Sequence, residues 1–213
     1  MTCNLRLTIK ICGMREAENI RAVEQLDIDW IGFIFYPPSP RYVSGDADAE
    51  TVRRCTRKKV GVFVDAGVGA MTATAERYGL DCVQLHGNES PETCLAMQAR
   101  GYPVIKAFSI ATAEDLKQTK AYETAAAYFL FDTKCEGFGG SGRRFDWSVI
   151  HDYDGRTPFL LSGGIAPGCE DELLHLRHPA MTGVDLNSGF ETAPAVKDTV
   201  ALAAFVKKIR MIF

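Results

Sequence analysis

Short apolar segments alternate with helix-like segments along the whole chain. The apolar segments are strand-sized, rich in β-branched or aromatic residues, and often end in a polar residue or glycine. They cover residues 7–12, 29–35, 59–64, 81–86, 103–109, 126–132, 158–163 and 182–187. The helix-like segments cover residues 15–26, 47–57, 70–78, 91–100, 113–123, 146–152, 170–176 and 195–210. Ser90 before Pro91, and Thr112 before Ala-Glu-Asp, are start signals for two of these helices.

Eight strand-then-helix units in one chain predict a parallel sheet with helical crossovers. We therefore predict an α/β fold, a closed (β/α)8 TIM barrel, as a single domain over residues 1–213. The alternative is an open doubly wound sheet, which commonly carries a GxGxxG turn after its first strand. Here the first strand ends in Cys-Gly-Met-Arg instead, and no linker or low-complexity tract marks a second domain.

Several predicted strands carry polar side chains among apolar ones. Side chains alternate along a strand, so residues two apart lie on the same face. Because the apolar neighbours are suited to face helices, we expect the polar set to point into the barrel, mostly near its C-terminal ends, where barrel enzymes hold their active sites. The set comprises Lys10, Cys12, Gln84, His86, Lys106, Asp132, Asp185 and Asn187.

The alternative interpretation is a cluster of satisfied ion pairs that merely fills the barrel. It suits Lys10 and Lys106, because a buried lysine is tolerated when paired with a carboxylate such as Asp185. It suits Cys12, His86 and Asp132 less well. Packing alone does not require a thiol, an imidazole and a carboxylate at one barrel mouth.

Two glycine-bearing turns follow the last two predicted strands, Ser162-Gly163-Gly164 and Asn187-Ser188-Gly189. Glycine lets the backbone approach a ligand closely, and backbone N–H groups can hold an anion. Either turn alone could be only a turn, but barrel enzymes often bind phosphate in the loops at these two positions. We therefore expect a phosphorylated small-molecule substrate. No Walker-type motif indicates a nucleoside triphosphate.

Two further loops carry basic residues. Residues 133–147 hold four glycines in six positions, flanked by Lys134, Arg143 and Arg144. This pattern is typical of a mobile lid over an anionic substrate, or of a plain surface loop. Residues 37–44 hold three prolines and Arg41, whose forked donors match a carboxylate. The alternative there is a surface turn with a solvated arginine.

The composition is that of an ordinary globular protein. A net charge of -3 gives no reason to expect nucleic acid or a membrane surface as partner. No apolar stretch is long enough to span a bilayer, and the N-terminus lacks signal-peptide features, so we expect a cytoplasmic protein. Seven cysteines without CxxC spacing favour reduced thiols over disulfides or zinc. No exposed apolar stripe stands out, which favours a monomer over a homodimer.

A set of short motifs runs in order along nearly the whole chain. The motifs are Lys10-Ile11-Cys12-Gly13, Gly32-Phe33-Ile34-Phe35 with Ser39-Pro40-Arg41, Gly61-Val62-Phe63-Val64, Gln84-Leu85-His86-Gly87, Phe131-Asp132-Thr133, Ser162-Gly163-Gly164, and Gly183-Val184-Asp185 with Ser188-Gly189. Taken together, they resemble the phosphoribosylanthranilate isomerase family. The resemblance implies an acid/base Amadori rearrangement in tryptophan biosynthesis without a cofactor or metal. The substrate would be N-(5-phosphoribosyl)anthranilate and the product 1-(2-carboxyphenylamino)-1-deoxyribulose 5-phosphate.

By this similarity, Asp132 would be the general acid and Cys12 the general base. Arg41 would bind the anthranilate carboxylate, the turns at 163–164 and 188–189 the phosphate, and His86 and Asp185 would join the substrate contacts. The chemistry agrees, since one acid opens the furanose ring to a Schiff base and one base removes the C2 proton. A free Asp has a pKa of about 3.9 and a free Cys about 8.5. The site must therefore raise the pKa of the acid, lower that of the thiol, or exchange a proton between them.

The chain departs from the family's commoner pattern at residues 165–169 and at Asn187. The role of Asn187 stays open, as does that of Cys135. Another sugar-phosphate barrel enzyme would share the phosphate turns but would not explain Cys12 with Asp132 and Arg41. A non-catalytic sugar-phosphate-binding barrel is the second rival, and the presence of both candidate catalytic residues argues against it.

Overall fold

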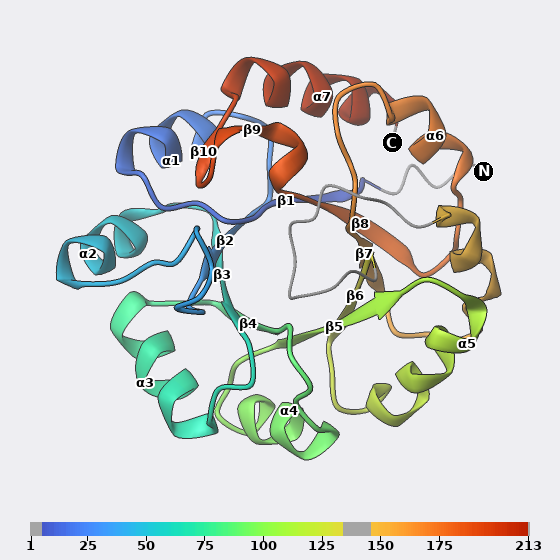
Figure 1. The fold of residues 1–213 in the computed structure, drawn as a ribbon, viewed down its shortest axis with the longest axis horizontal. Helices are drawn as coiled ribbons and strands as arrows, with labels where there is room; N and C mark the ends of the chain where they lie inside the picture. Colours follow the sequence, from blue (N-terminus) through green and yellow to red (C-terminus); the bar gives the residue numbers. More distant parts are fainter. Residues whose placement is uncertain (1–5, 134–145, 213) are drawn as a thin grey trace.

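The computed structural model describes residues 6–133 and 146–212. Its centre is a closed barrel of eight parallel strands, in which each strand pairs with the next and β8 closes on β1 (Figure 1). The predicted (β/α)8 barrel is confirmed. The strands are β1 (Thr8–Ile11), β2 (Trp30–Ile34), β3 (Lys58–Phe63), β4 (Cys82–Leu85), β5 (Val104–Ile110), β6 (Tyr128–Thr133), β7 (Phe159–Leu161) and β8 (Met181–Leu186).

Helices surround the barrel in the order that the alternating pattern predicts (Figure 1). Both start signals are confirmed, because the Ser90 side chain accepts a hydrogen bond from the Thr93 N–H and Thr112 forms a capping box with Asp115. The helices are α1 (Ala17–Glu24), α2 (Asp46–Arg54), α3 (Val68–Tyr78), α4 (Pro91–Gln98), α5 (Ala113–Leu116) with the 3-10 helix η1 (Lys117–Tyr122), the 3-10 helix η2 (Trp147–Asp152), α6 (Glu170–His175) and α7 (Thr199–Ile212). No described helix is long and apolar enough to cross a membrane.

Alternation along the strands divides the buried side chains into two layers. A large outer layer lies between the strands and the helices and includes Ile9, Phe33, Val83, Phe129 and Val184. A smaller inner layer fills the barrel itself. Its members are Trp30, Val60, Cys82, Ile105, Ala107, Leu130 and Leu160. This division decides which polar residues can reach the barrel mouth.

The prediction that Lys106 points into the barrel is wrong. Its neighbours Ile105 and Ala107 belong to the inner layer, so Lys106 lies on the outer face of β5. There its Nζ donates to the Gly87 carbonyl at 2.8 Å and to Glu89 Oε2 at 3.1 Å. Both faces of β5 are apolar around the lysine, so the alternation by itself could not assign the lysine to a face.

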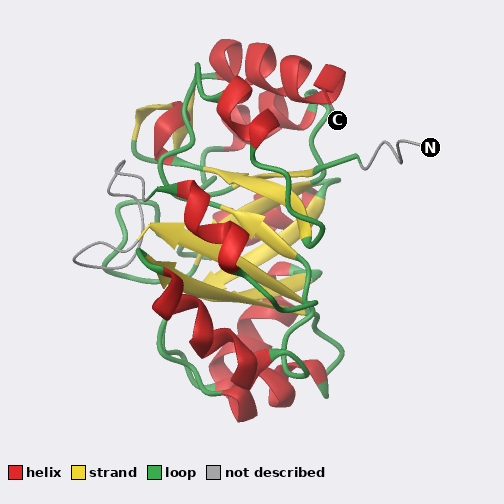
Figure 2. Cartoon of the chain, turned by 90° about the vertical axis from the view of Figure 1, so that its right-hand side faces the viewer, coloured by secondary structure: helices red, strands yellow, loops and turns green. Residues whose placement is uncertain are grey.

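A short antiparallel ribbon follows the 3-10 helix η3 (Ser188–Phe190). It consists of β9 (Glu191–Ala193) and β10 (Val196–Lys197), and α7 begins only at Thr199 instead of at the predicted residue 195. Asn19 of α1 fastens the ribbon, because its side chain exchanges two hydrogen bonds with the backbone of Lys197, at 2.8 and 2.9 Å. Figure 2 shows the barrel from the side, with the ribbon at the end toward which the barrel strands run.

Candidate active site

The C-terminal end of β1 carries Cys12 among buried charged groups. Lys10, two residues earlier, donates from Nζ to Asp185 Oδ1 at 2.7 Å. The Ser162 hydroxyl donates to the other oxygen of Asp185 at 3.3 Å. Cys12 is only 3% exposed. The structure thus brings together the predicted Lys10, Cys12 and Asp185, and it confirms the ion pair expected for Lys10.

Of the three ways to prepare the acid and the base, a lowered pKa of the Cys12 thiol is not the one found. Burial raises the pKa of the thiol, and the nearby ammonium groups of Lys10 and Lys197 offset this only in part, while Asp185 adds to the rise. Desolvation dominates because a thiolate enclosed in protein loses its hydration. The Lys10 pKa is raised on balance, because Asp185 and Cys12 outweigh the burial that would lower it. The resting site therefore holds a neutral thiol beside a fixed cation.

A second group of predicted residues meets at the ends of β4 and β6. His86 Nε2 lies 3.3 Å from Asp132 Oδ2. The Gln84 amide nitrogen lies 2.9 Å from His86 Nδ1. If the amide donates there, the neutral imidazole carries its proton on Nε2, facing the carboxylate. The sequence did not predict the pairing of His86 with Asp132. Spacing within each strand places both residues at the barrel mouth, but it does not say how close the ends of β4 and β6 lie.

Arg41 lies over Gly13, the residue after Cys12, and binds a carboxylate of the protein itself. A Cβ atom on Gly13 would lie 2.6 Å from Arg41 Cδ, which shows how closely the side chain passes. The guanidinium donates to Glu191 from Nε at 2.9 Å and from Nη2 at 2.6 Å. Lys197 Nζ donates to the same carboxylate at 2.6 Å and to Asn187 Oδ1 at 2.8 Å.

Glu191 and Lys197 are site residues that sequence reasoning missed. Both lie in the β9–β10 ribbon. The sequence pattern predicts a helix from residue 195 and assigns no element to residues 191–194. The one available signal was the position of Glu191, two residues after the glycine of the second phosphate turn.

The two candidate phosphate turns lie side by side. Gly163 and Gly164 adopt φ values of 82° and 73°, a left-handed conformation that favours glycine. Gly189 packs so closely on the carbonyl oxygen of Ile165 that a Cβ atom there would clash with it. Trp147 supports the first turn by donating from Nε1 to the Gly163 carbonyl at 3.2 Å. Turns from β7 and β8 can thus present their backbones to one anion.

Residues 134–145 lie outside the described residues. They include most of the predicted lid, with Lys134, Arg143 and Arg144, and also Cys135. Among the residues that the structure does describe, no group of three or more His, Cys, Asp or Glu side chains is placed to hold a metal ion.

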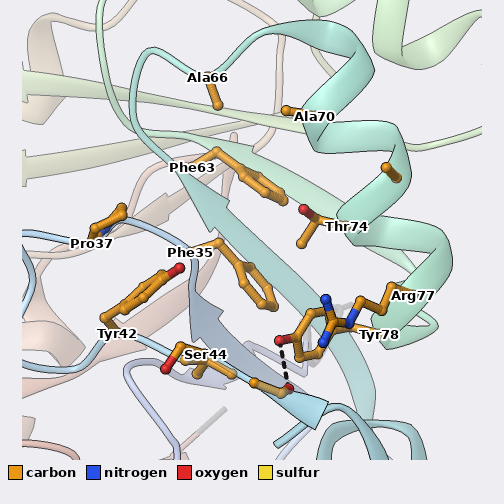
Figure 3. A pocket seen from close by; sticks show the side chains of 13 residues that line it. Phe35, Pro37, Tyr42, Ser44, Phe63, Ala66, Ala70, Thr74, Arg77 and Tyr78 are labelled. Carbon is orange, nitrogen blue, oxygen red and sulfur yellow. Dashed lines mark hydrogen bonds between the residues drawn. The ribbon is translucent and has the colours of Figure 1, made fainter.

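A pocket of about 320 Å³ lies apart from these residues, between α3 and the segment after β2 (Figure 3). Phe35 and Phe63 line it and stack on each other, with ring centroids 5.4 Å apart. The Tyr78 hydroxyl closes one side by donating to the Gly45 carbonyl at 3.1 Å. Phe63 belongs to the outer layer of the core, so this pocket opens outside the barrel and is separate from the candidate active site.

The closed barrel, with a thiol and an imidazole-paired carboxylate at its strand ends, defines a (β/α)8-barrel enzyme. The family model described as N-(5'phosphoribosyl)anthranilate (PRA) isomerase matches residues 9–208. The N-(5'-phosphoribosyl)anthranilate isomerase of Parabacteroides distasonis is 53% identical over 206 residues, covering 95% of this chain and 93% of the relative. The chain therefore belongs to the N-(5'-phosphoribosyl)anthranilate isomerase family and is an isomerase, which confirms the resemblance.

Solved structures of the family have the same fold. The phosphoribosyl anthranilate isomerase of Thermus thermophilus has a TM-score of 0.84 and 30% identity, covering 97% of this chain and 100% of that one. Monomers generated from the dimeric Thermotoga maritima enzyme have a TM-score of 0.82 and 31% identity, with coverages of 96% and 99%. An isomerase in complex with reduced 1-(o-carboxyphenylamino)-1-deoxyribulose 5-phosphate has a TM-score of 0.81 and 31% identity, with coverages of 96% and 99%.

Proposed function

We propose that this chain converts N-(5-phosphoribosyl)anthranilate into 1-(2-carboxyphenylamino)-1-deoxyribulose 5-phosphate in tryptophan biosynthesis, without a cofactor. The observation that carries the proposal is that Cys12 and the His86–Asp132 pair follow strands that end on the same side of the parallel barrel. A ligand bound to a related isomerase is a reduced form of the same product, which supports the choice of substrate.

Asp132 serves as the general acid in this proposal and Cys12 as the general base. The protonated carboxyl of Asp132 gives its proton to the furanose ring oxygen, and the C1–O bond breaks as the anthranilate nitrogen lone pair forms a Schiff base. The Cys12 thiolate then removes the C2 proton, and the resulting enolamine tautomerises to the ketone.

One proton must return from the thiol to the carboxylate before the next turnover. Asp132 ends the first step ionised, and Cys12 ends the second step as a thiol. Burial raises the pKa of Cys12, so the thiol is favoured at rest and the thiolate, once formed, is a strong base. The raised pKa argues against a resting thiolate, so the proposal relies on the exchange of a proton between the two groups.

The remaining groups suit the two anionic ends of the substrate. Arg41 would bind the anthranilate carboxylate through its forked donors. Gly163 and Gly164, together with Ser188 and Gly189, would hold the phosphate between the two adjoining turns. His86 and Asp185, near the acid and the base respectively, complete the proposed substrate contacts.

Fluorescence of the anthranilate substrate tests the proposal directly. We expect fluorescence to decay when the purified chain is added, in buffer with EDTA and without nicotinamide. A sugar-phosphate epimerase, an aminoaldose isomerase of histidine biosynthesis and a non-catalytic binding barrel would all leave the signal unchanged. Unchanged fluorescence with correctly folded protein would overturn the proposal.

We also propose one domain over residues 1–213 and a cytoplasmic monomer. The five described cysteines, all buried, are free thiols, which supports a reducing compartment.

The monomer is supported by the surface. Among described residues the exposed large apolar side chains are scattered over α4 and α7, namely Leu95, Val200 and Met211. Light scattering after size exclusion should give the chain mass of 23.4 kDa at all concentrations. Twice that mass would overturn the monomer.

A further inference from the structure

Within the described residues, the Arg41 guanidinium forms hydrogen bonds along only one of its edges. Nε and Nη2 donate to the two oxygens of Glu191 at 2.9 and 2.6 Å. Within the described part of the chain, Nη1 donates no hydrogen bond. The Arg41 side chain is 11% exposed, so the remaining edge is enclosed but still open to a ligand. A guanidinium held along its Nε–Nη2 edge can present its other edge to a second carboxylate.

Glu191 is itself held in place by the ribbon that carries it. Lys197 Nζ donates to Oε1 at 2.6 Å, and the Ala195 N–H donates to the same oxygen at 3.2 Å. Ala195 adopts a φ of 67°, a left-handed conformation that is unfavourable for an alanine. The Glu191 side chain is 6% exposed. The strained turn at Ala195 directs its N–H toward the buried carboxylate of Glu191 and so helps to fix the position of that carboxylate.

The charges around Glu191 favour one more anion. Burial would raise the pKa of Glu191, but hydrogen bonds and charge from Arg41 and Lys197 lower it on balance, so the group is a carboxylate at neutral pH. Two cations therefore share a single carboxylate here, and the neighbouring Lys10–Asp185 pair is already balanced. Burial lowers the pKa of Lys197, and the hydrogen bond to Glu191 opposes this. Among the described residues, with both cations charged and Cys12 as a neutral thiol, the buried positive charges exceed the negative ones by one. An incoming substrate carboxylate would balance this excess.

We propose that Glu191 is a positioning residue that binds Arg41 along one edge and turns its other edge toward the carboxylate of the substrate. The inference rests on the proposed contact between Arg41 and that carboxylate. Glu191 would not touch the reacting atoms. In the alternative arrangement, Glu191 competes with the substrate for Arg41. Removing the charge of Glu191 would then lower the KM, whereas loss of a positioning residue would raise it.

Glu191→Gln separates these two arrangements. It keeps the shape of the side chain but removes its charge, so the orientation of Arg41 is no longer enforced. We expect the KM to rise about tenfold or more, because hydrogen bonds to charged groups are worth about 1.5–3 kcal/mol, while kcat changes little. Glu50→Gln is the matched control, since Glu50 pairs with Arg54 on the exposed surface of α2. A lower KM in Glu191→Gln would establish competition and overturn the proposal.

Inhibition by inorganic phosphate distinguishes a positioning role of Glu191 from general damage to the segment that carries it. Glu191 lies two residues after Gly189 of the phosphate turn, so a distorted segment would weaken phosphate inhibition and raise the KM together. A positioning role raises the KM and leaves the phosphate inhibition constant unchanged. Glu191→Asp, which keeps the charge on a shorter arm, should give an intermediate KM. This second variant keeps the test decisive if Glu191→Gln folds poorly.

A double-mutant cycle with Arg41→Ala completes the test. If Glu191 acts through Arg41, Glu191→Gln should raise the KM in the native background and add nothing in the Arg41→Ala background. An unchanged KM in Arg41→Ala would refute the carboxylate contact in the proposed function. A raised KM in Arg41→Ala, with an unchanged KM in Glu191→Gln, would refute the positioning role alone.

Discussion

The ammonium of Lys10 and the carboxylate of Asp185 form a buried ion pair, with Nζ 2.7 Å from Oδ1 and side chains 0% and 5% exposed. The strands place the two residues opposite each other where β8 closes the barrel on β1. The same ammonium partly offsets the burial that raises the pKa of the Cys12 thiol. A pair that fills the barrel therefore also sets the charge beside the candidate base. Structural and functional interpretations of Lys10 are compatible.

Lys10→Met should destabilise the protein by about 3–5 kcal/mol, because it leaves the Asp185 carboxylate buried without its cation. Adding Asp185→Leu should restore most of that stability, since an apolar pair needs no compensation, but should not restore activity. Urea unfolding measures both variants, with equal m-values as the check on two-state behaviour. If Lys10→Met alone is as stable as the native protein, the ion pair contributes nothing to the free energy of unfolding.

Cys12→Ala should reduce kcat by orders of magnitude with little loss of fold, because the proposed base is removed from a strand end. Cys94→Ala is a suitable control. Cys94 is also fully buried, but it lies in α4 in the outer layer of the core. The control should lose some stability and keep its kcat. A Cys12→Ala enzyme with most of its activity would remove the thiol from the base role.

Asp132→Asn should lower kcat to a similar extent, because an amide cannot give a proton to the ring oxygen. The change is nearly isosteric, so His86, whose Nε2 lies 3.3 Å from the carboxylate, keeps a polar neighbour. The measurement is kcat at saturating substrate, with circular dichroism to confirm the fold. Retained kcat would refute the acid role and leave the His86 pairing as a structural contact.

Gly32→Ala should impair the enzyme although Gly32 makes no contact through a side chain. A Cβ atom there would lie 2.8 Å from Cys12 Sγ and 3.1 Å from Lys10 Nζ, so the thiol or the ammonium must move. Displacements of this kind cost activity more than stability when they act on a reacting group. Gly69→Ala in α3 is the control, because its Cβ atom would meet nothing within 4 Å. Equal kcat in both variants would contradict the tight packing around the thiol.

Strand alternation predicted the barrel and the inward face of β1, because an apolar residue and a polar residue alternate there over several positions. The same rule failed for Lys106, whose two strand neighbours face inward and whose next neighbours, Val104 and Phe108, are apolar as well. With apolar residues on both faces, the period identifies a strand without saying which face is inside.

The Glu191 support for Arg41 could not be predicted from spacing, since the two residues are 150 positions apart. Their contact depends on the ribbon after β8, and that ribbon depends on a left-handed alanine and on hydrogen bonds to Asn19 of α1. Neither has a local signature in the sequence. The placement of Cys12 and Asp132 at one end of the barrel could be predicted, because barrel topology alone brings strand ends together. Contacts between loops follow from packing.

His178 should make the stability of the protein depend on pH in the mildly acidic range. Its Nδ1 accepts a hydrogen bond from the Ala180 N–H at 3.1 Å, and its Nε2 donates to the Tyr153 carbonyl at 2.9 Å. Burial lowers the pKa of His178, and the bond to Tyr153 offsets this only in part. The folded protein therefore binds this proton less readily than the unfolded chain does. Protonation at Nδ1 would also break the bond from Ala180.

The sign of the effect follows from that lowered pKa. The contribution of His178 to stability is fully present above the unfolded pKa of about 6.5, and it is lost as the pH falls through the lower folded value. Urea unfolding between pH 8 and pH 5 should show a steeper loss for the native protein than for His178→Gln. Parallel profiles for the native protein and His178→Gln would show that folding does not favour the neutral form of the His178 imidazole.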